Sequence, residues 1–176
     1  PQAYGILQTA TDEVNALKII REIDDVHYTP SYSLMVGYGD HELPAWDGVV
    51  CKNNGLEFIS NEASKKSHNQ ECSLVVQASP GFTRFLRGKD DEIIVRELLD
   101  NLAAVAGGWA AAPKWHQLHY WRYSRASKAL SYPFMELEFE DAPLALIGDY
   151  FRGVTVDDAY CSGLNLAKKW SEKYSA

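Results

Sequence analysis

Alternation of apolar and polar residues with a period of two, in separate segments, is the feature that most limits what this chain can fold into. From Tyr32 to Tyr38 every second residue is aliphatic or aromatic, which is typical of a strand with one buried face. The mostly apolar run from Cys72 to Ala78 predicts a central strand. Asn53-Asn54-Gly55 lies between two β-type runs, residues 48–52 and 56–60, and predicts a hairpin.

Three segments instead have apolar residues at near-helical spacing. The first covers residues 11–23, the second begins after Asp90 and ends at Gly107, and the last runs from about Val156 to Lys173. The predicted buried stripe of the second helix consists of Ile94, Leu98, Leu102 and Val105. Short strands are expected at 134–139 and 144–147, and a polar, exposed loop at 61–71. Helices interrupted by groups of strands, without regular βαβ alternation, predict an α+β domain on a largely antiparallel sheet with flanking helices.

Residues 114–124 alternate again, so Trp121 and Tyr123 share one face and Arg122 takes the other. Core packing is the ordinary role of two such aromatic side chains. The alternative is that Trp121, Arg122 and Tyr123 line a ligand pocket, and Arg122 would then need an anionic partner. Tyr28, Tyr32 and Tyr38 form either an aromatic wall or a core stripe, and the core stripe is the favoured interpretation.

Composition restricts the classes of partner. The net charge of −7 argues against binding of a nucleic-acid backbone. Since no apolar run reaches the ~20 residues of a membrane-spanning helix, we expect a soluble, intracellular protein without a membrane partner. Cys51, Cys72 and Cys161 lack metal-ligand spacing, so we expect no metal and three buried or half-buried free thiols in a reducing compartment.

The most informative stretch is a strand–turn–helix corner near the end of the chain. A short apolar strand leads to Gly148, which allows close approach of a backbone or ligand, and to Asp149, a hydrogen-bond acceptor. The helix that follows directs its amino-terminal amides and positive dipole end at the same place, and Ala159 and Gly163 permit close packing. The pattern predicts an anion- and polyol-binding site. The alternative is a structural corner in which Asp149 is only a cap.

The sequence also resembles a known family. Gly148-Asp149, a glycine-bearing loop and residues 156–163 resemble the carboxyl-terminal flavin motif of FAD-dependent amine-oxidase-like proteins, and more narrowly of their renalase-like branch. Further blocks resemble that branch in the same order, namely Pro1-Gln2, Pro44–Gly48, Asn61–Lys65, Ala78–Pro80 and Trp121–Ser124. The resemblance extends from Pro1 to about Tyr174. It departs at Asp158, where that branch commonly has glycine and where a carboxylate would disfavour an anionic reduced flavin.

The resemblance implies a two-lobed protein. Residues 1–140 would be part of the substrate domain, and residues 141–176 would be the last strand and helix of a Rossmann-type FAD-binding domain. The first half of that domain would be missing and would lie upstream of Pro1, as a partner segment to this chain. In agreement, no Gly-x-Gly-x-x-Gly that opens a helix after a strand occurs in the sequence.

The family's binding residues are carried over as expectations. Asp149 would contact the ribityl or pyrophosphate region of FAD, with Gly148 and Ala159 beside it. The amides of Val156 and Asp157 would face the N1–O2 edge of the flavin and stabilise negative charge there. The substrate pocket would be formed by Trp121, Arg122 and Tyr123. Catalytic residues are not assigned.

The implied activity is hydride transfer to FAD from a reduced small molecule, such as an NAD(P)-type nicotinamide dinucleotide or an amine, with oxygen as the acceptor. The compartment would be the cytoplasm or the plastid stroma. We expect this chain alone to bind no FAD, to be inactive, and to expose apolar surface on its last strand and helix that favours dimerisation. The alternative is a free-standing, non-catalytic domain of the same ancestry that binds a ligand or a protein.

Overall fold

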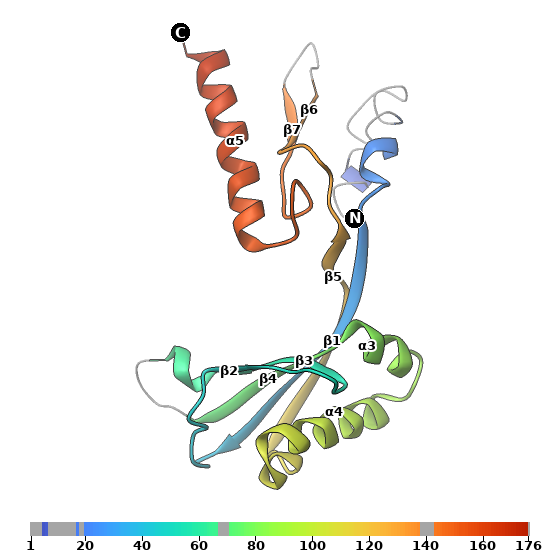
Figure 1. The fold of residues 1–176 in the computed structure, drawn as a ribbon, viewed down its shortest axis with the longest axis vertical. Coiled ribbons are helices and arrows are strands. Elements are labelled where there is room, and N and C mark those ends of the chain that lie inside the picture. Colours follow the sequence, from blue (N-terminus) through green and yellow to red (C-terminus); the bar gives the residue numbers. More distant parts are fainter. Residues whose placement is uncertain (1–4, 7–16, 18–19, 67–70, 138–142, 176) are drawn as a thin grey trace. The chain divides into compact units, whose positions relative to one another are not determined.

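The computed structural model describes residues 5–6, 17, 20–66, 71–137 and 143–175. Its elements are β1 (His27–Gly39), β2 (Gly48–Val50), β3 (Leu56–Asn61), η1 (Ala63–Lys65), β4 (Cys72–Ala78), α3 (Pro80–Leu86), α4 (Asp91–Ala106), η2 (Gly108–Ala111), β5 (Trp115–Lys128), β6 (Met135–Leu137), β7 (Leu144–Leu146) and α5 (Val156–Tyr174). Figure 1 shows them along the chain. The predicted α+β class, with a mostly antiparallel sheet and flanking helices, is confirmed.

The chain forms two compact units. Unit 1 combines Pro1–Thr29 with Tyr123–Ala176, and unit 2 is Pro30–Arg122. The chain therefore passes between the units twice, once within β1 and once within β5. The predicted division at residues 140 and 141 falls inside unit 1 and, as a statement about the lobes of a larger protein, stays a prediction.

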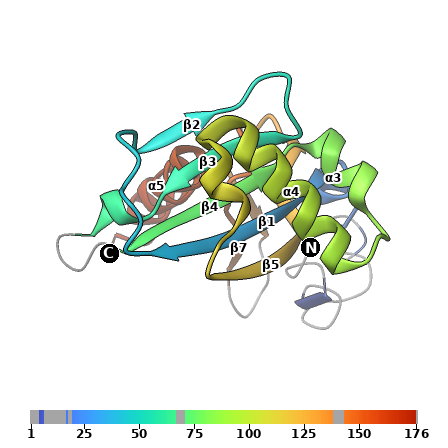
Figure 2. The ribbon, with the colours of Figure 1, turned by 90° about the horizontal axis from the view of Figure 1, so that it is seen from below.

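Unit 2 is built on a five-stranded sheet in the order β2-β3-β4-β1-β5. The hairpin predicted around Asn53-Asn54-Gly55 is present: β2 pairs with β3 in antiparallel register, and Asn53 takes the positive φ of 58° that the turn needs. The predicted central position of β4 is also confirmed, because it pairs antiparallel with β3 and β1. Helix α4 lies across one face of this sheet (Figure 2).

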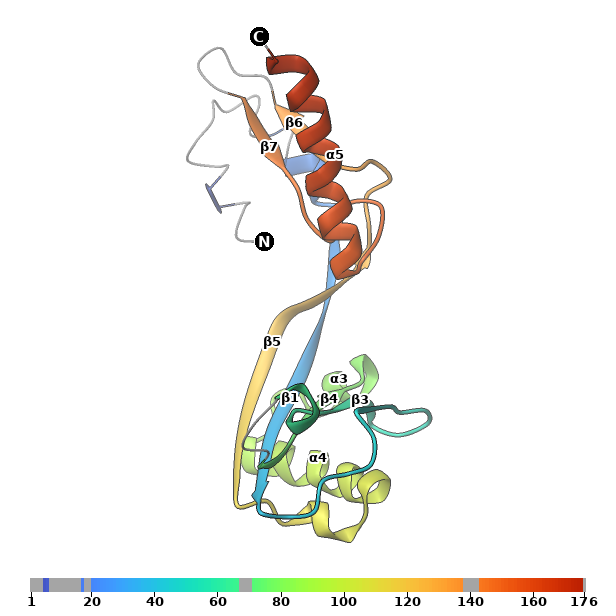
Figure 3. The same cartoon turned by 90° about the vertical axis from the view of Figure 1, so that its left-hand side faces the viewer.

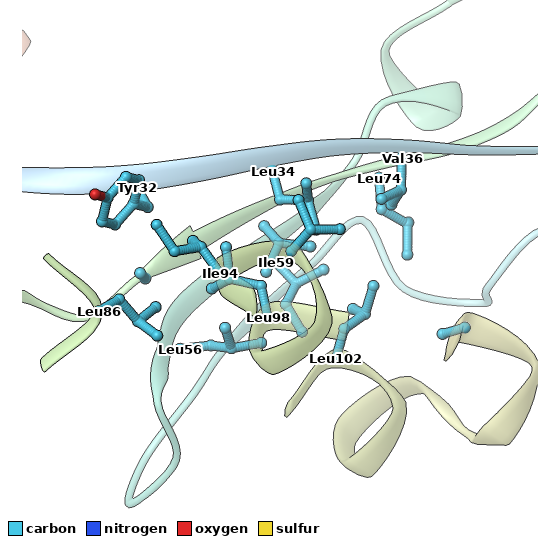
Figure 4. Close-up of a cluster of buried hydrophobic side chains, with 14 of the residues drawn as sticks. Tyr32, Leu34, Val36, Leu56, Ile59, Leu74, Leu86, Ile94, Leu98 and Leu102 are labelled. Atoms are coloured by element: carbon cyan, nitrogen blue, oxygen red, sulfur yellow. The ribbon is translucent and has the colours of Figure 1, made fainter. Parts of the chain in front are cut away.

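The core of unit 2 lies between α4 and that face. Leu34, Val36, Ile59 and Leu74 point from the strands towards the helix, and Ile94, Leu98 and Leu102 point back from it (Figure 4). All of them are essentially inaccessible to solvent, so the alternation in the sequence does mark the buried face of the strands. Val105, predicted in the same stripe, is instead 37% exposed, because it lies in the last turn of α4, at the end of the stripe.

Two parts of unit 2 differ from the sequence-based expectation. The exposed loop predicted over 61–71 is not simply a loop, because Asn61 is the last residue of β3 and η1 follows it. Asn61 is buried, and its side-chain amide donates to the carbonyls of Pro44 and Trp46 at 3.4 and 3.2 Å. Helix α3 was not predicted. It begins at Pro80 after Ser79, whose hydroxyl accepts from the amide of Phe82 at 3.2 Å, a start signal that the sequence contains.

Unit 1 has a smaller core formed by Leu130, Met135, Leu146 and Phe151. The two-stranded sheet of β6 and β7 is antiparallel, which confirms the predicted short strands over the residues described. Helix α5 runs beside this sheet (Figure 3), with the bounds expected from the sequence. Of the helix predicted over 11–23, residues 17 and 20–23 are helical, and the remainder lies outside the described residues.

None of the helices that the structure describes is long and apolar enough to span a membrane. All three cysteines carry free thiols. Cys72 is buried and Cys51 half-buried, as expected, but Cys161 is exposed on α5.

Candidate functional site

The candidate site is the corner in unit 1 where β7 leads through a turn into α5. Thr155 is the N-cap of α5 and forms a capping box with Asp158. The hydroxyl of Thr155 accepts from the amide of Asp158 at 3.2 Å, and the Asp158 carboxylate accepts from the Thr155 amide at 2.8 Å and hydroxyl at 2.6 Å. These hydrogen bonds lower the pKa of Asp158. Asp158, a departure from the family pattern, therefore acts as a cap for the helix.

The capping box leaves two amides of the first turn unused. The amides of Val156 and Asp157 have no hydrogen-bond acceptor within the part of the chain that the structure describes. The first amides of a helix have no intrahelical partner and carry the positive end of the helix dipole. Two of the predicted cofactor-binding residues thus offer free donors at a helix start that faces solvent.

Gly148 fixes the turn that precedes this helix. Its amide donates to the hydroxyl of the buried Ser162 at 3.2 Å, which ties the end of β7 to α5. A Cβ atom at Gly148 would lie 2.6 Å from the ring of Tyr150. Close approach at Gly148 is therefore made by Tyr150 of the same chain, and glycine is needed there for internal packing. Ser162 was not singled out from the sequence, because a serine inside a helix carries no distinctive signal.

The charge of Asp149 acts on two tyrosines, Tyr28 from a distant part of the chain and the adjacent Tyr150. Burial, followed by the charge of Asp149, raises the pKa of Tyr28 to about 12, and the same two causes raise the pKa of Tyr150. Tyr28 also packs edge to face against Tyr123, with ring centroids 5.9 Å apart. The structure therefore brings Asp149, a predicted cofactor residue, and Tyr123, a predicted pocket residue, to the same part of unit 1 through Tyr28.

Tyr28 was missed as a site residue. It is half-buried and belongs to unit 1, whereas Tyr32 and Tyr38 are buried in the core of unit 2. The interpretation of all three as one stripe is wrong, because β1 passes from one unit to the other after Thr29. No local motif in the sequence marks that change.

Helix α5 also has an uncovered apolar face. Val156, Tyr160 and Leu164 recur every four residues and are 87%, 69% and 40% exposed, and Ile147 after β7 is 47% exposed. Residues at this spacing lie on one side of a helix. The expected exposed apolar surface on the last strand and helix is therefore present in the structure. Ala159 is half-buried, and a Cβ at Gly163 would lie 3.6 Å from Ile147, in ordinary contact.

The opposite face of α5 is held by the β6–β7 sheet. Glu136 of β6 forms ion pairs with Lys169 and, at 3.3 Å, with Lys173, and accepts from the indole of Trp170 at 2.9 Å. Hydrogen bonds from Lys169 and Trp170 lower the pKa of Glu136 to about 2. Glu136 thereby fixes α5 in unit 1, and the corner at the other end of the helix is placed with it.

The remaining pocket residues lie on β5. Trp121 and Arg122 belong to unit 2 and are exposed, and Tyr123 belongs to unit 1. Trp121 is 51% and Tyr123 is 42% exposed, so the interpretation of these two aromatic residues as core packing is wrong. On β5 it is the other face, with Leu118 and Tyr120, that packs against the core.

The sequence matches no family model and no curated protein. Among solved structures, cyclohexylamine oxidase from Brevibacterium oxydans is similar over 61% of this chain, with a TM-score of 0.47 and 13% identity. Putrescine oxidase bound to putrescine is similar over 51%, with a TM-score of 0.42 and 14% identity. This chain spans 24% and 21% of those two proteins. These scores establish neither a common fold nor a common function.

Proposed function

We propose that this chain is part of a renalase-like, FAD-dependent oxidoreductase and that the corner at the start of α5 holds the flavin. The observation that carries the proposal is the pair of unused amides at Val156 and Asp157 on an open helix start. An anionic or strongly polar edge of a ligand is stabilised at such a position by both the donors and the helix dipole.

The residues around these amides fit the group. Asp149 supplies an acceptor suited to the hydroxyls of a ribityl chain, and Tyr28 beside it has a pKa of about 12 and so keeps its proton at neutral pH. Val156 and Tyr160 offer an apolar surface on which a flat ring system or another protein segment can rest. The Asp158 carboxylate is hydrogen-bonded within the cap, so its charge is partly neutralised by local donors.

In this proposal FAD supplies the redox chemistry, accepting hydride from a reduced small molecule such as a nicotinamide dinucleotide or an amine and passing electrons to oxygen. The chain's own contribution is position and electrostatics. Asp149 and the two amides would hold opposite parts of the cofactor, while Glu136 keeps α5 in place. A further segment carrying the pyrophosphate-binding turn would complete the site, and it would cover the apolar face of α5.

The test is the flavin content of the natural gene product that contains this chain. We expect a flavin absorption spectrum in that protein, a strong loss of flavin in Asp149→Ala, and retention in Asp157→Ala, which removes a neighbouring carboxylate but keeps the amide. The present chain alone should be colourless, because the remaining contacts do not offset the entropy of holding a large cofactor. Absence of flavin from the natural protein would favour the alternative, a non-catalytic binding domain.

A further inference from the structure

The tip of the β2–β3 hairpin contains a chemically reactive pair that the proposed function leaves unexplained. Asn54-Gly55 is the only asparagine–glycine pair in the sequence. Such a pair deamidates when the deprotonated amide nitrogen of the glycine attacks the Cγ atom of the asparagine, because glycine leaves the approach open. The N–Cγ bond forms and the bond from Cγ to Nδ2 breaks, so ammonia leaves and a cyclic imide remains. Water then opens the imide to aspartate or isoaspartate.

Packing requires glycine at the second position of this pair. A Cβ atom at Gly55 would lie 2.7 Å from the ring of Phe82 in α3. The positive φ of the turn belongs to Asn53 and not to Gly55, so the backbone conformation is not the reason for the glycine. A larger residue, which would slow the attack, therefore has no room at this position. Protection of the pair has to come from the residues around it.

Asn101 of α4 holds both members of the reactive pair. Its side-chain oxygen Oδ1 accepts from the amide of Gly55 at 3.2 Å, and its carbonyl oxygen accepts from Nδ2 of Asn54 at 3.3 Å. The Asn101 side chain is itself oriented, because its Nδ2 donates to the carbonyl of Glu97 at 2.8 Å. The hairpin tip is therefore bound to α4 by the two groups that react in deamidation.

Ring closure is incompatible with these contacts. The Gly55 nitrogen must lose the proton that it donates to Asn101, and a hydrogen bond stabilises the protonated form. Nδ2 of Asn54 must leave as ammonia, which breaks the second contact with Asn101. The other polar groups of the pair are bonded as well: Oδ1 of Asn54 accepts from the amide of Leu56, and the Gly55 carbonyl from the amide of Ser79, each at 2.9 Å.

We propose that Asn54 is a latent deamidation site, which Asn101 keeps unreactive while α4 is packed against the hairpin, and that reaction at Asn54 releases the hairpin tip from α4. Segments of a folded protein open locally with different free energies. The modification therefore proceeds from the fraction of molecules in which the contacts with Asn101 are broken. This inference does not depend on the proposed flavin site, which lies in unit 1.

The products of the reaction cannot restore the contacts. An aspartate side chain at position 54 has no donor, and its charge would face the carbonyl oxygen of Asn101. Isoaspartate also adds a methylene group to the main chain before Gly55. The next residue, Leu56, is buried in the core and pairs with Ala78 of β4, so the longer main chain would disturb the start of β3. Deamidation thus makes the local opening irreversible.

The test compares the rate of deamidation at Asn54 in the folded 176-residue chain and in a capped peptide of residues 52–57, both at mildly alkaline pH. Peptide mapping by mass spectrometry, with separation of the aspartyl and isoaspartyl forms, measures the rates. We expect the folded chain to react at least about tenfold more slowly than the peptide. Asn101→Ala should react about fivefold faster than the unsubstituted chain, because the hydrogen bond to Gly55 is lost.

Two variants separate protection by Asn101 from a general loss of stability. Asn101→Asp loses the contact with Glu97, as alanine does, but keeps an oxygen that accepts from the Gly55 amide, and it should react more slowly than Asn101→Ala. Val95→Ala weakens the core of unit 2 but leaves the contacts of Asn101, and it should react at the rate of the unsubstituted chain.

A further pair of variants tests the release of the hairpin tip. Asn54→Asp reproduces the aspartyl product and should increase hydrogen exchange of the Gly55 and Leu56 amides, whereas Asn53→Asp, which adds the same charge one residue earlier, should not. The proposal is overturned if the folded chain reacts as fast as the peptide, if alanine and aspartate at position 101 behave alike, if Val95→Ala accelerates the reaction as much as Asn101→Ala, or if Asn54→Asp leaves the exchange unchanged.

Discussion

The two principal helices, α4 in unit 2 and α5 in unit 1, use their apolar residues in different ways. The stripe of α4 is matched by the sheet beneath it, within a cluster of 16 buried residues. The core cluster of unit 1 among the described residues has four buried members, none of them in α5. Helix α5 buries Ser162 and Leu166, while Val156, Tyr160 and Leu164 remain exposed. Among the described residues, the core of unit 2 thus covers most of the apolar stripe of α4, whereas one apolar side of α5 in unit 1 stays exposed.

This difference indicates where the chain is adapted to something beyond itself. A helix that is apolar on two sides is expected to be covered on both. One side of α5 is fixed by Glu136 and the β6–β7 sheet. The other, apolar side begins next to the unused amides of Val156 and Asp157. The apolar surface and the free donors are adjacent, which is the arrangement that a cofactor and a covering segment would require.

The largest loss of stability is expected from a substitution in the core of unit 2. Leu98→Ala at the centre of α4 should destabilise unit 2 by about 2 to 5 kcal/mol, because a fully buried side chain is replaced by a cavity. Val105→Ala, on the same helix but exposed, should change stability by less than about 0.5 kcal/mol. Chemical denaturation combined with hydrogen exchange of the β4 amides measures both. Equal effects of the two substitutions would contradict the assignment of the core.

What could be predicted from the sequence follows the same division between the two units. The strands and α4 were predictable because period-two and helical patterns report burial within a local segment. The corner was predictable as a motif from Gly148, Asp149 and the helix start. The role of Tyr28 was not, since it depends on where β1 passes between units. The face of β5 was misjudged because alternation separates two faces without indicating which one is buried.

The contacts that hold α5 on the β6–β7 sheet depend on the charge of Glu136. The pKa of Glu136 is lowered from 4.5 to about 2 in the folded state. Its contacts with Lys169 and Trp170 therefore stabilise α5 fully above about pH 4.5, and this contribution is lost as the pH falls through about 2. Hydrogen exchange of α5 amides and Trp170 fluorescence should show this loss on acidification, and in Glu136→Gln the same readouts should lack the step. A step that persists in that variant would assign it to another group.

Loss of the capping box at the start of α5 is expected to have a smaller effect on stability. Thr155→Ala should destabilise α5 by about 1 kcal/mol, and Thr155→Ser should retain most of the stability because it keeps the accepting hydroxyl. Thermal unfolding of unit 1, followed by hydrogen exchange of the first turn of α5, measures the difference. If alanine and serine behave alike, the hydroxyl does not cap the helix.

The smallest change in the stability of this chain is expected from a substitution on the exposed side of α5, and comparison with the buried side distinguishes the two. Tyr160→Ser should change the stability of the chain alone by less than about 0.5 kcal/mol, because the side chain is exposed. Leu166→Ser, on the buried side of the same helix, should be clearly destabilising. In the natural gene product that contains this chain, Tyr160→Ser should become destabilising as well, since the proposed covering segment would bury that position. Unchanged stability there would mean that nothing covers this face.

The most direct test of the account is the flavin midpoint potential of the natural protein with Val156→Pro, compared with Val156→Ala. Proline is well tolerated at the first position of a helix, so the substitution removes one amide donor and leaves α5 intact. We predict a potential lower by on the order of 30 mV or more in Val156→Pro, because a donor to the reduced, anionic flavin is lost, and no change in Val156→Ala. Identical potentials in the two variants would contradict the placement of the flavin at the start of α5.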